Sequence, residues 1–174
     1  VRSAHQQILF EPPDTKDHGG GKKTVMTKME RCRKANEYHE KKLSCGQSVL
    51  VAFTDITGLT EEQSIALSSG FGNGMRCGSM CGVISAAVVV LGMRYPATLE
   101  DGAEGKKRST RLVQEFQRRF AEQFKNLNCR DLLADKELVG TPAAQELGVT
   151  QHCRLLVVSG TELLSDMLDE LEAQ

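Results

Sequence analysis

Six cysteines are the residues of this chain best suited to chemistry, and four of them stand where a helix is expected to begin. The four, each with its candidate capping residue, are Cys45 with Ser44, Cys81 with Ser79, Cys129 with Asn128, and Cys153 with Thr150. Ser, Asn and Thr favour the N-cap position, and a helix N-terminus offers unpaired N–H groups and partial positive charge. A thiol in that field loses its proton more readily, and the thiolate is the form that binds soft metals and reacts with disulfides.

The spacing of the cysteines excludes several familiar sites. The chain has no Cys-x-x-Cys pair, which argues against thioredoxin-type chemistry and zinc-finger spacing, and without such a pair it has no attachment motif for c-type haem. The closest two, Cys77 and Cys81, are four residues apart, so the fold must assemble any shared site. The alternative is that the cysteines only pack as small buried hydrophobic residues, and the spacing leaves both readings open.

Composition narrows the class of protein. A chain of 174 residues with 40% hydrophobic residues predicts one folded domain. A net charge of -1, with 5% aromatic residues and no Trp, argues against a nucleic-acid partner. The longest apolar run, Val83 to Leu91, is too short for membrane insertion, and no secretory signal is visible. We therefore expect a cytoplasmic protein, in which six cysteines indicate metal-binding or reactive thiols rather than disulfides.

The elements that must position the cysteines are helical. Residues 1–24 contain Pro12-Pro13 and a run of three glycines and predict a flexible N-terminal leader, followed by a single helical redox-type domain over 25–174. Apolar spacing and capping residues predict helices over about 25–43, 45–57, 60–69, 106–127, 129–134, 141–148 and 151–173. Periodicity leaves Val83 to Leu91 ambiguous between strand and helix. The fold class expected is all-α, a compact multi-helix bundle.

A glycine-rich turn precedes the Cys77 and Cys81 region. Gly70, Gly72 and Gly74 alternate with other residues, but no strand precedes them and no Lys follows as a phosphate-binding loop requires. The turn is either a simple helix cap or a place where main-chain N–H groups approach an anion, including a cluster sulfur.

The order of these motifs resembles a family of redox-active proteins named for its cysteines and its Cys-Gly-Ala-x-x-Gly motif. The matching features run from Cys45 to about Val158: an early cysteine, the glycine-rich turn, Cys81-Gly82 opening an apolar segment, Asn128-Cys129-Arg130, and the late Cys153. The chain departs from the family pattern at Val83 and Ala86, where the family has Ala and Gly. The resemblance implies that 83–91 is a helix. A similar domain occurs beside the haem segments of split-Soret cytochromes, where it is linked to an iron–sulfur centre.

The resemblance implies that Cys45, Cys81, Cys129 and Cys153 form the functional set, with Cys32 and Cys77 additional to it. Four thiolates could hold an iron–sulfur cluster, hold a structural zinc, or cycle between thiols and a disulfide without metal. We expect the cluster, in a small protein for electron transfer or redox sensing, with Cys77 as a replacement ligand or accessory thiol. The glycines expected to line the cofactor are Gly70, Gly72, Gly74 and Gly82. The expected partner is a redox protein, and a homodimer is left open.

Overall fold

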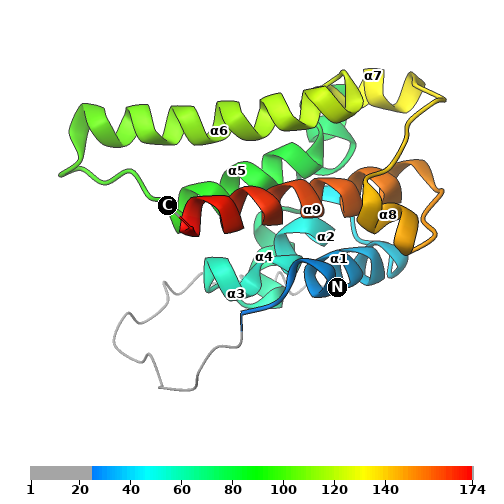
Figure 1. The fold of residues 1–174 in the computed structure, drawn as a ribbon, viewed down its shortest axis with the longest axis horizontal. Coiled ribbons are helices and arrows are strands. Elements are labelled where there is room, and N and C mark those ends of the chain that lie inside the picture. The colour runs from blue at the N-terminus through cyan, green and yellow to red at the C-terminus, as the bar shows by residue number, and fades with distance from the viewer. Residues whose placement is uncertain (1–24, 174) are drawn as a thin grey trace, which may run out of the picture.

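The computed structural model describes residues 25–173, and most of these residues are helical (Figure 1). In chain order they are α1 (Lys28–Glu40), α2 (Cys45–Ala52), α3 (Thr54–Thr57), α4 (Glu61–Leu67), the π-helical turn η1 (Gly74–Gly78), α5 (Gly82–Arg94), α6 (Gly102–Phe124), α7 (Cys129–Ala134), α8 (Pro142–Glu146) and α9 (His152–Glu172). The described residues contain no strand beyond one isolated bridge between Met80 and Asn128. The predicted all-α bundle is confirmed, while the predicted leader over 1–24 lies outside the described residues.

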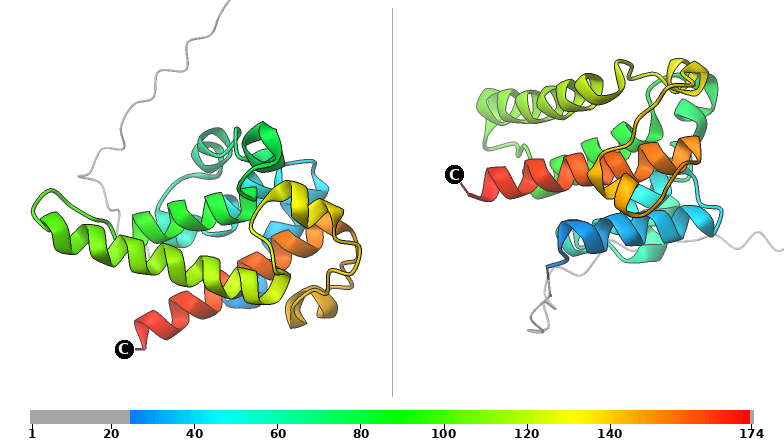
Figure 2. Two further views of the ribbon diagram at one scale, coloured as in Figure 1. Left: turned by 90° about the horizontal axis from the view of Figure 1, so that it is seen from above. Right: turned by 45° about the vertical axis from the view of Figure 1, so that its right-hand side comes forward.

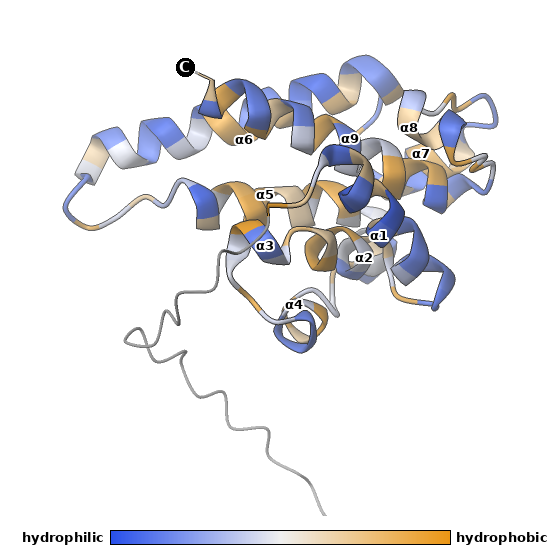
Figure 3. Cartoon of the chain, turned by 60° about the horizontal axis from the view of Figure 1, so that its bottom comes forward, coloured by the Kyte–Doolittle hydropathy of each residue, from blue (hydrophilic) through white to orange (hydrophobic). Residues whose placement is uncertain are grey.

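The central helices are α2, α5 and α9, which contact one another, while α1 packs on α2 and α9 and α6 packs on α5 and α9. Figure 2 shows α6 and α1 on opposite sides of this centre. In Figure 3 the outer side of α1 is hydrophilic whereas α5 is largely hydrophobic, as its central position requires. Phe116, Phe120 and Phe124 recur every fourth residue of α6 and are fully buried or nearly so, so one face of α6 closes the core. Among the described residues, no helix combines the length and apolarity needed to cross a membrane.

Two predicted boundaries differ from the structure. The helix expected over 45–57 breaks at Phe53, whose fully buried ring separates α2 from the single turn α3. The helix expected over about 106–127 begins earlier, at Gly102, and ends at Phe124. Residues 83–91 are helical, as the family resemblance implied.

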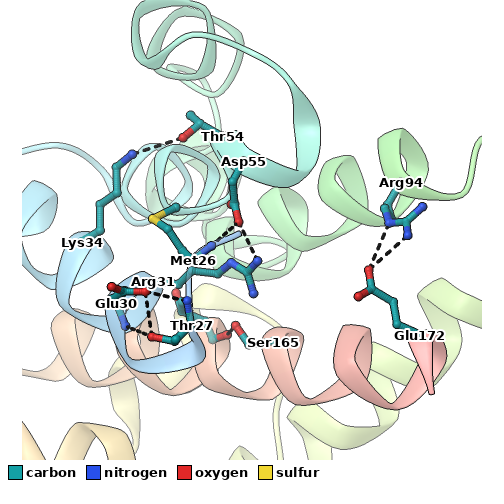
Figure 4. A network of polar contacts seen from close by, with 11 residues as sticks. Met26, Thr27, Glu30, Arg31, Lys34, Thr54, Asp55, Arg94, Ser165 and Glu172 are labelled. Atoms are coloured by element: carbon teal, nitrogen blue, oxygen red, sulfur yellow. Dashed lines mark hydrogen bonds and ion pairs between the residues drawn. The ribbon is translucent and has the colours of Figure 1, made fainter. Parts of the chain in front are cut away.

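A buried ion pair links α1 to α3 at this break. The guanidinium of Arg31 lies 2.7 Å from the carboxylate of Asp55, and the two side chains are only 3% and 7% exposed. The same carboxylate oxygen accepts a hydrogen bond from the main-chain N–H of Met26 at 3.0 Å (Figure 4). Arg31 also lies over the Phe53 ring, 5.2 Å from its centroid. These contacts explain why the chain turns after α2 instead of continuing as one helix.

The first residues of several helices gather at one end of the bundle. Figure 1 shows α5, α7 and α9 all beginning at the right-hand end. The segments before α5 and α7 are joined by two main-chain hydrogen bonds, from Cys81 N–H to Leu127 O at 2.9 Å and from Cys129 N–H to Ser79 O at 2.7 Å. This pairing sets the starts of two cysteine-bearing helices side by side.

Candidate functional site

All four cysteines lie at helix N-termini. Cys45 and Cys129 are the first residues of α2 and α7, Cys81 is the N-cap of α5, and Cys153 is the second residue of α9. Two of the expected caps were wrong. Cys81 itself caps α5 in place of Ser79, and Gln151 caps α9 in place of Thr150, its side-chain oxygen accepting from the N–H of Arg154 at 2.7 Å.

Cys45 is the activated thiol of the group. Its pKa is lowered from 9.0 to about 6, first by its hydrogen bond with the Cys81 thiol and then by the main-chain N–H groups of Gly46, Asn73 and Gly82, against the opposing effect of burial. Gly46 and Gly82 lie in the first turns of α2 and α5, where N–H groups have no helical partner. The thiolate of Cys45 is therefore held between the starts of two helices and the glycine-rich turn.

Cys81 is the protonated partner of Cys45. Its side chain is 2% exposed, and its pKa is raised well above the usual value, first because its thiol donates to Cys45, then by burial and by the charge of Cys45. The pair thus shares one proton, with the negative charge on Cys45. A thiolate that interacts with a neighbouring thiol is the arrangement from which a disulfide can form.

The charge of Cys45 also affects the pKa values of the two remaining thiols. Burial, followed by the charge of Cys45, raises the pKa of Cys129 and that of Cys153. The fold thus places all four predicted cysteines close enough together for the charge of Cys45 to shift the pKa values of the other three. Within residues 25–173, however, no three Cys, His, Asp or Glu side chains lie close enough together to hold one metal ion.

Two of the predicted glycines are required by close packing around the cysteines. A Cβ on Gly82 would lie 2.7 Å from the Cys45 sulfur, and a Cβ on Gly74 would lie 2.7 Å from the Cβ of Cys129. Gly72 is similarly close to Ser44, at 2.8 Å, whereas Gly70 has open space on its outer side. A side chain at Gly82 or Gly74 would push into the cysteine site.

The glycine-rich segment forms a left-handed turn that sequence reasoning missed. Asn73, Gly74, Met75 and Arg76 have φ values of 58°, 58°, 56° and 64° in succession. Asn tolerates this region, but each of the other two side chains costs about 1 kcal/mol or more there. Such strain tends to occur at functional sites, and here it places the Asn73 N–H against the Cys45 sulfur. The Asn73-Gly74 pair was the available sequence signal, because both residues accept positive φ.

The two additional cysteines have separate surroundings. Cys32 is fully buried and donates to the carbonyl of Val158 at 3.7 Å, and burial raises its pKa to about 12, so it packs in the core. Cys77 is exposed in η1, where its thiol donates to the carbonyl of Gly74 at 3.3 Å. The ring of His152 contacts the carbonyl of Leu132 at 2.6 Å, a structural contact at the start of α9.

This end of a helical bundle, with one thiolate and three protonated thiols at helix starts, defines a cysteine-based redox protein by its fold and chemistry. Residues 43–167 match the family model described as "Putative redox-active protein (C_GCAxxG_C_C)". The match covers most of the chain, which therefore belongs to this family. Comparison with curated proteins and with solved structures found no match.

Proposed function

We propose that the chain is a thiol/disulfide oxidoreductase whose reacting groups are Cys45 and Cys81. The observation that carries this proposal is that the Cys45 sulfur lies against the start of α5, 2.7 Å from the position of a Cβ on Gly82, and that it interacts with the thiol of the adjacent Cys81 so that the two pKa values shift in opposite directions. The thiolate is the nucleophile in disulfide exchange, and the second thiol is needed to resolve the mixed disulfide. Cys45 supplies the thiolate and Cys81 supplies the second thiol.

The reaction transfers two electrons from the pair to a disulfide substrate. The Cys45 thiolate attacks one substrate sulfur, a mixed disulfide forms, and the first substrate thiolate leaves. Cys45 then carries no charge, so the largest cause that raises the pKa of Cys81 disappears. Cys81 loses its proton to solvent or to the departed thiolate and attacks the Cys45 sulfur. The Cys45–Cys81 disulfide forms, and the second substrate thiolate is released.

The test is to oxidise the reduced protein with the neutral disulfide dithiodipyridine and map the products by mass spectrometry. The expected result is a disulfide between the peptides of Cys45 and Cys81, with one equivalent of the reagent consumed for each pair. The matched control, Cys153→Ser, should form the same disulfide. A disulfide that joins Cys129 to Cys153 in its place, or persistent mixed disulfides on Cys45, would contradict the assignment.

An iron–sulfur cluster on Cys45, Cys81, Cys129 and Cys153 is the second candidate. It is favoured by the charge that Cys45 exerts on the other three thiols and by the N–H groups around its sulfur. The donor type fits such a cluster or a zinc ion. The positions of the four sulfurs do not fit either group, since no three ligands converge among residues 25–173. Cys129 and Cys153 would have to move toward Cys45 and Cys81 to bind it.

Metal analysis separates the two candidates. Protein purified without oxygen should contain neither iron nor zinc in stoichiometric amounts if the dithiol is the functional form. Brown protein whose visible absorbance and iron are both lost in Cys129→Ser would establish the cluster instead. Colourless protein with bound zinc that is lost in the same variant would establish a zinc site.

A further inference from the structure

Two exposed arginines stand beside the cysteine site. The first is Arg76, in the left-handed turn, whose guanidinium donates to the carbonyl of Ser69 at 3.2 Å. Its guanidinium carbon is 3.9 Å from the position that a Cβ of Gly72 would take, and that position is 2.8 Å from the Cβ of Ser44. Arg76 therefore lies close to the residue that immediately precedes Cys45.

The second is Arg130, which follows Cys129 in α7. Its guanidinium donates to the carbonyl of Cys77 at 3.4 Å, and its Nε lies 3.3 Å from the position of a Cβ on Gly78. Arg130 also lines a surface cleft of about 260 Å³. The residues around this cleft are Cys77, Gly78, Ser79, Asn128, Arg130 and Asp131.

The positive charges of these arginines are not neutralised within the described part of the chain. Their guanidinium groups donate to main-chain carbonyls, and neither has a carboxylate within 4.0 Å among residues 25–173. The leading stabilisers of the Cys45 thiolate are Cys81 and main-chain N–H groups, and neither arginine is among them. Both charges remain available to a ligand.

An acidic residue lies near Arg130. Asp131 lines the same cleft as Arg130, and its carboxylate accepts from the side-chain amide of Asn128 at 3.5 Å. It would repel an anionic ligand approaching Arg130. Removing the Asp131 charge should therefore favour such a ligand.

We propose that Arg76 and Arg130 make the site selective for disulfides that carry carboxylates close to their sulfur atoms. The inference rests on the proposed thiol/disulfide function. Arginine binds carboxylates through its planar set of donors, and positive charge beside a reacting site raises the association rate of anionic substrates. The same charges favour the substrate thiolate that leaves when Cys45 attacks. Such a disulfide can be a small molecule with carboxylates or an acidic segment of a protein.

The experiment measures the second-order rate of exchange of the reduced protein with four probes at low ionic strength. They are glutathione disulfide, the same molecule with its carboxylates esterified, the cationic disulfide cystamine, and the disulfide dimer of a short acidic cysteine peptide. A carboxylate-bearing probe should react about tenfold faster than its uncharged or cationic counterpart, and added salt should reduce that advantage. A fast reaction of glutathione disulfide indicates a small-molecule source, whereas a fast reaction of the peptide alone indicates an acidic protein.

Matched variants identify the residues responsible. Arg76→Gln and Arg130→Gln should each slow the favoured anionic probe about threefold or more and leave cystamine unchanged or faster. Arg130→Lys, which keeps the charge, should recover part of the rate, and Asp131→Asn should increase it. Lys106→Gln removes an equal charge from the exposed part of α6 and should change nothing.

Equal rates for all four probes in the wild-type protein would overturn the inference and leave the proposed function standing. The same conclusion follows if the arginine variants and Lys106→Gln have equal effects, because only the net charge would then matter. If no disulfide reacts with the protein, the thiol/disulfide function itself fails and the inference fails with it.

Discussion

Replacing Cys81 by alanine should raise the pKa of the Cys45 thiol, because the Cys81 thiol is the largest cause that lowers it. At a pKa of about 6, about 90% of Cys45 is thiolate at neutral pH, against about 1% at the ordinary value of 9.0. The difference between these pKa values corresponds to about 4 kcal/mol. Shared among one thiol and three N–H donors, it assigns at least about 1 kcal/mol to Cys81, which is about a fivefold change in acidity.

Serine at the same position separates the hydrogen bond from the packing. Cys81→Ser keeps an O–H donor beside the Cys45 sulfur, whereas Cys81→Ala keeps none. The pKa of Cys45 should therefore rise more in the alanine variant than in the serine variant. The assay is the rate of alkylation by iodoacetamide against pH, with the modified cysteine identified by peptide mapping. At pH 5, below the pKa of Cys45, the alanine variant should react about fivefold to tenfold more slowly, whereas at neutral pH, where half or more of Cys45 stays thiolate in both proteins, the difference should be about twofold.

The control is Cys153→Ser, which removes a thiol that is protonated at neutral pH because its own pKa is raised by burial and by the charge of Cys45. That variant should leave the pH profile of Cys45 unchanged. The reasoning is refuted if Cys81→Ala still titrates near 6. It is also refuted if the alanine and serine variants shift equally, since the cause would then be altered burial and not a lost donor.

Three further predictions concern stability. Gly82→Ala should destabilise the fold by about 2 kcal/mol, because the added Cβ would lie 2.7 Å from the Cys45 sulfur. Gly92→Ala, in the same helix, places its Cβ in open space and should stabilise the fold by about 0.5 kcal/mol. The denaturant midpoints of the two variants measure both effects. Asp55→Ala should cost about 3 kcal/mol by leaving the Arg31 charge buried without its partner, and equal stability of the variant would contradict this. Because the folded pKa of Cys45 lies below its unfolded value of 9.0, its stabilising effect should be complete above pH 9.0 and lost as pH falls to about 6. In Cys45→Ser that part of the pH dependence should be absent.

The cysteine positions were predictable because helix capping depends on neighbouring residues. Ser44 and Asn128 are the caps of α2 and α7, and the helices begin at the next residue in both cases. The observed caps of α5 and α9 lie closer to the cysteines than the predicted Ser79 and Thr150 do: Cys81 is itself the N-cap of α5, and Cys153 is the second residue of α9. Local sequence therefore predicted the electrostatic setting of each thiol separately.

The features that join these thiols were not predictable in this way. The left-handed turn at Asn73 depends on contacts with Ser79, Cys129 and Cys45, which lie on other elements or further along the chain. The break at Phe53 likewise depends on burial of its ring beneath Arg31 of α1. Tertiary packing determines both the turn and the break, and a periodic pattern of apolar residues does not predict such packing.

The unequal protonation of the four thiols also distinguishes the two chemical uses of the site. The charge of Cys45 helps to keep Cys81, Cys129 and Cys153 protonated, so one thiolate limits the formation of the others. Disulfide exchange needs only one thiolate at a time. A cluster or zinc ion needs every ligand deprotonated, so binding would release about three protons and weaken steeply as pH falls. The proposed exchange function needs no further deprotonation of the reduced site, whereas metal binding would have to overcome the raised pKa values of Cys81, Cys129 and Cys153.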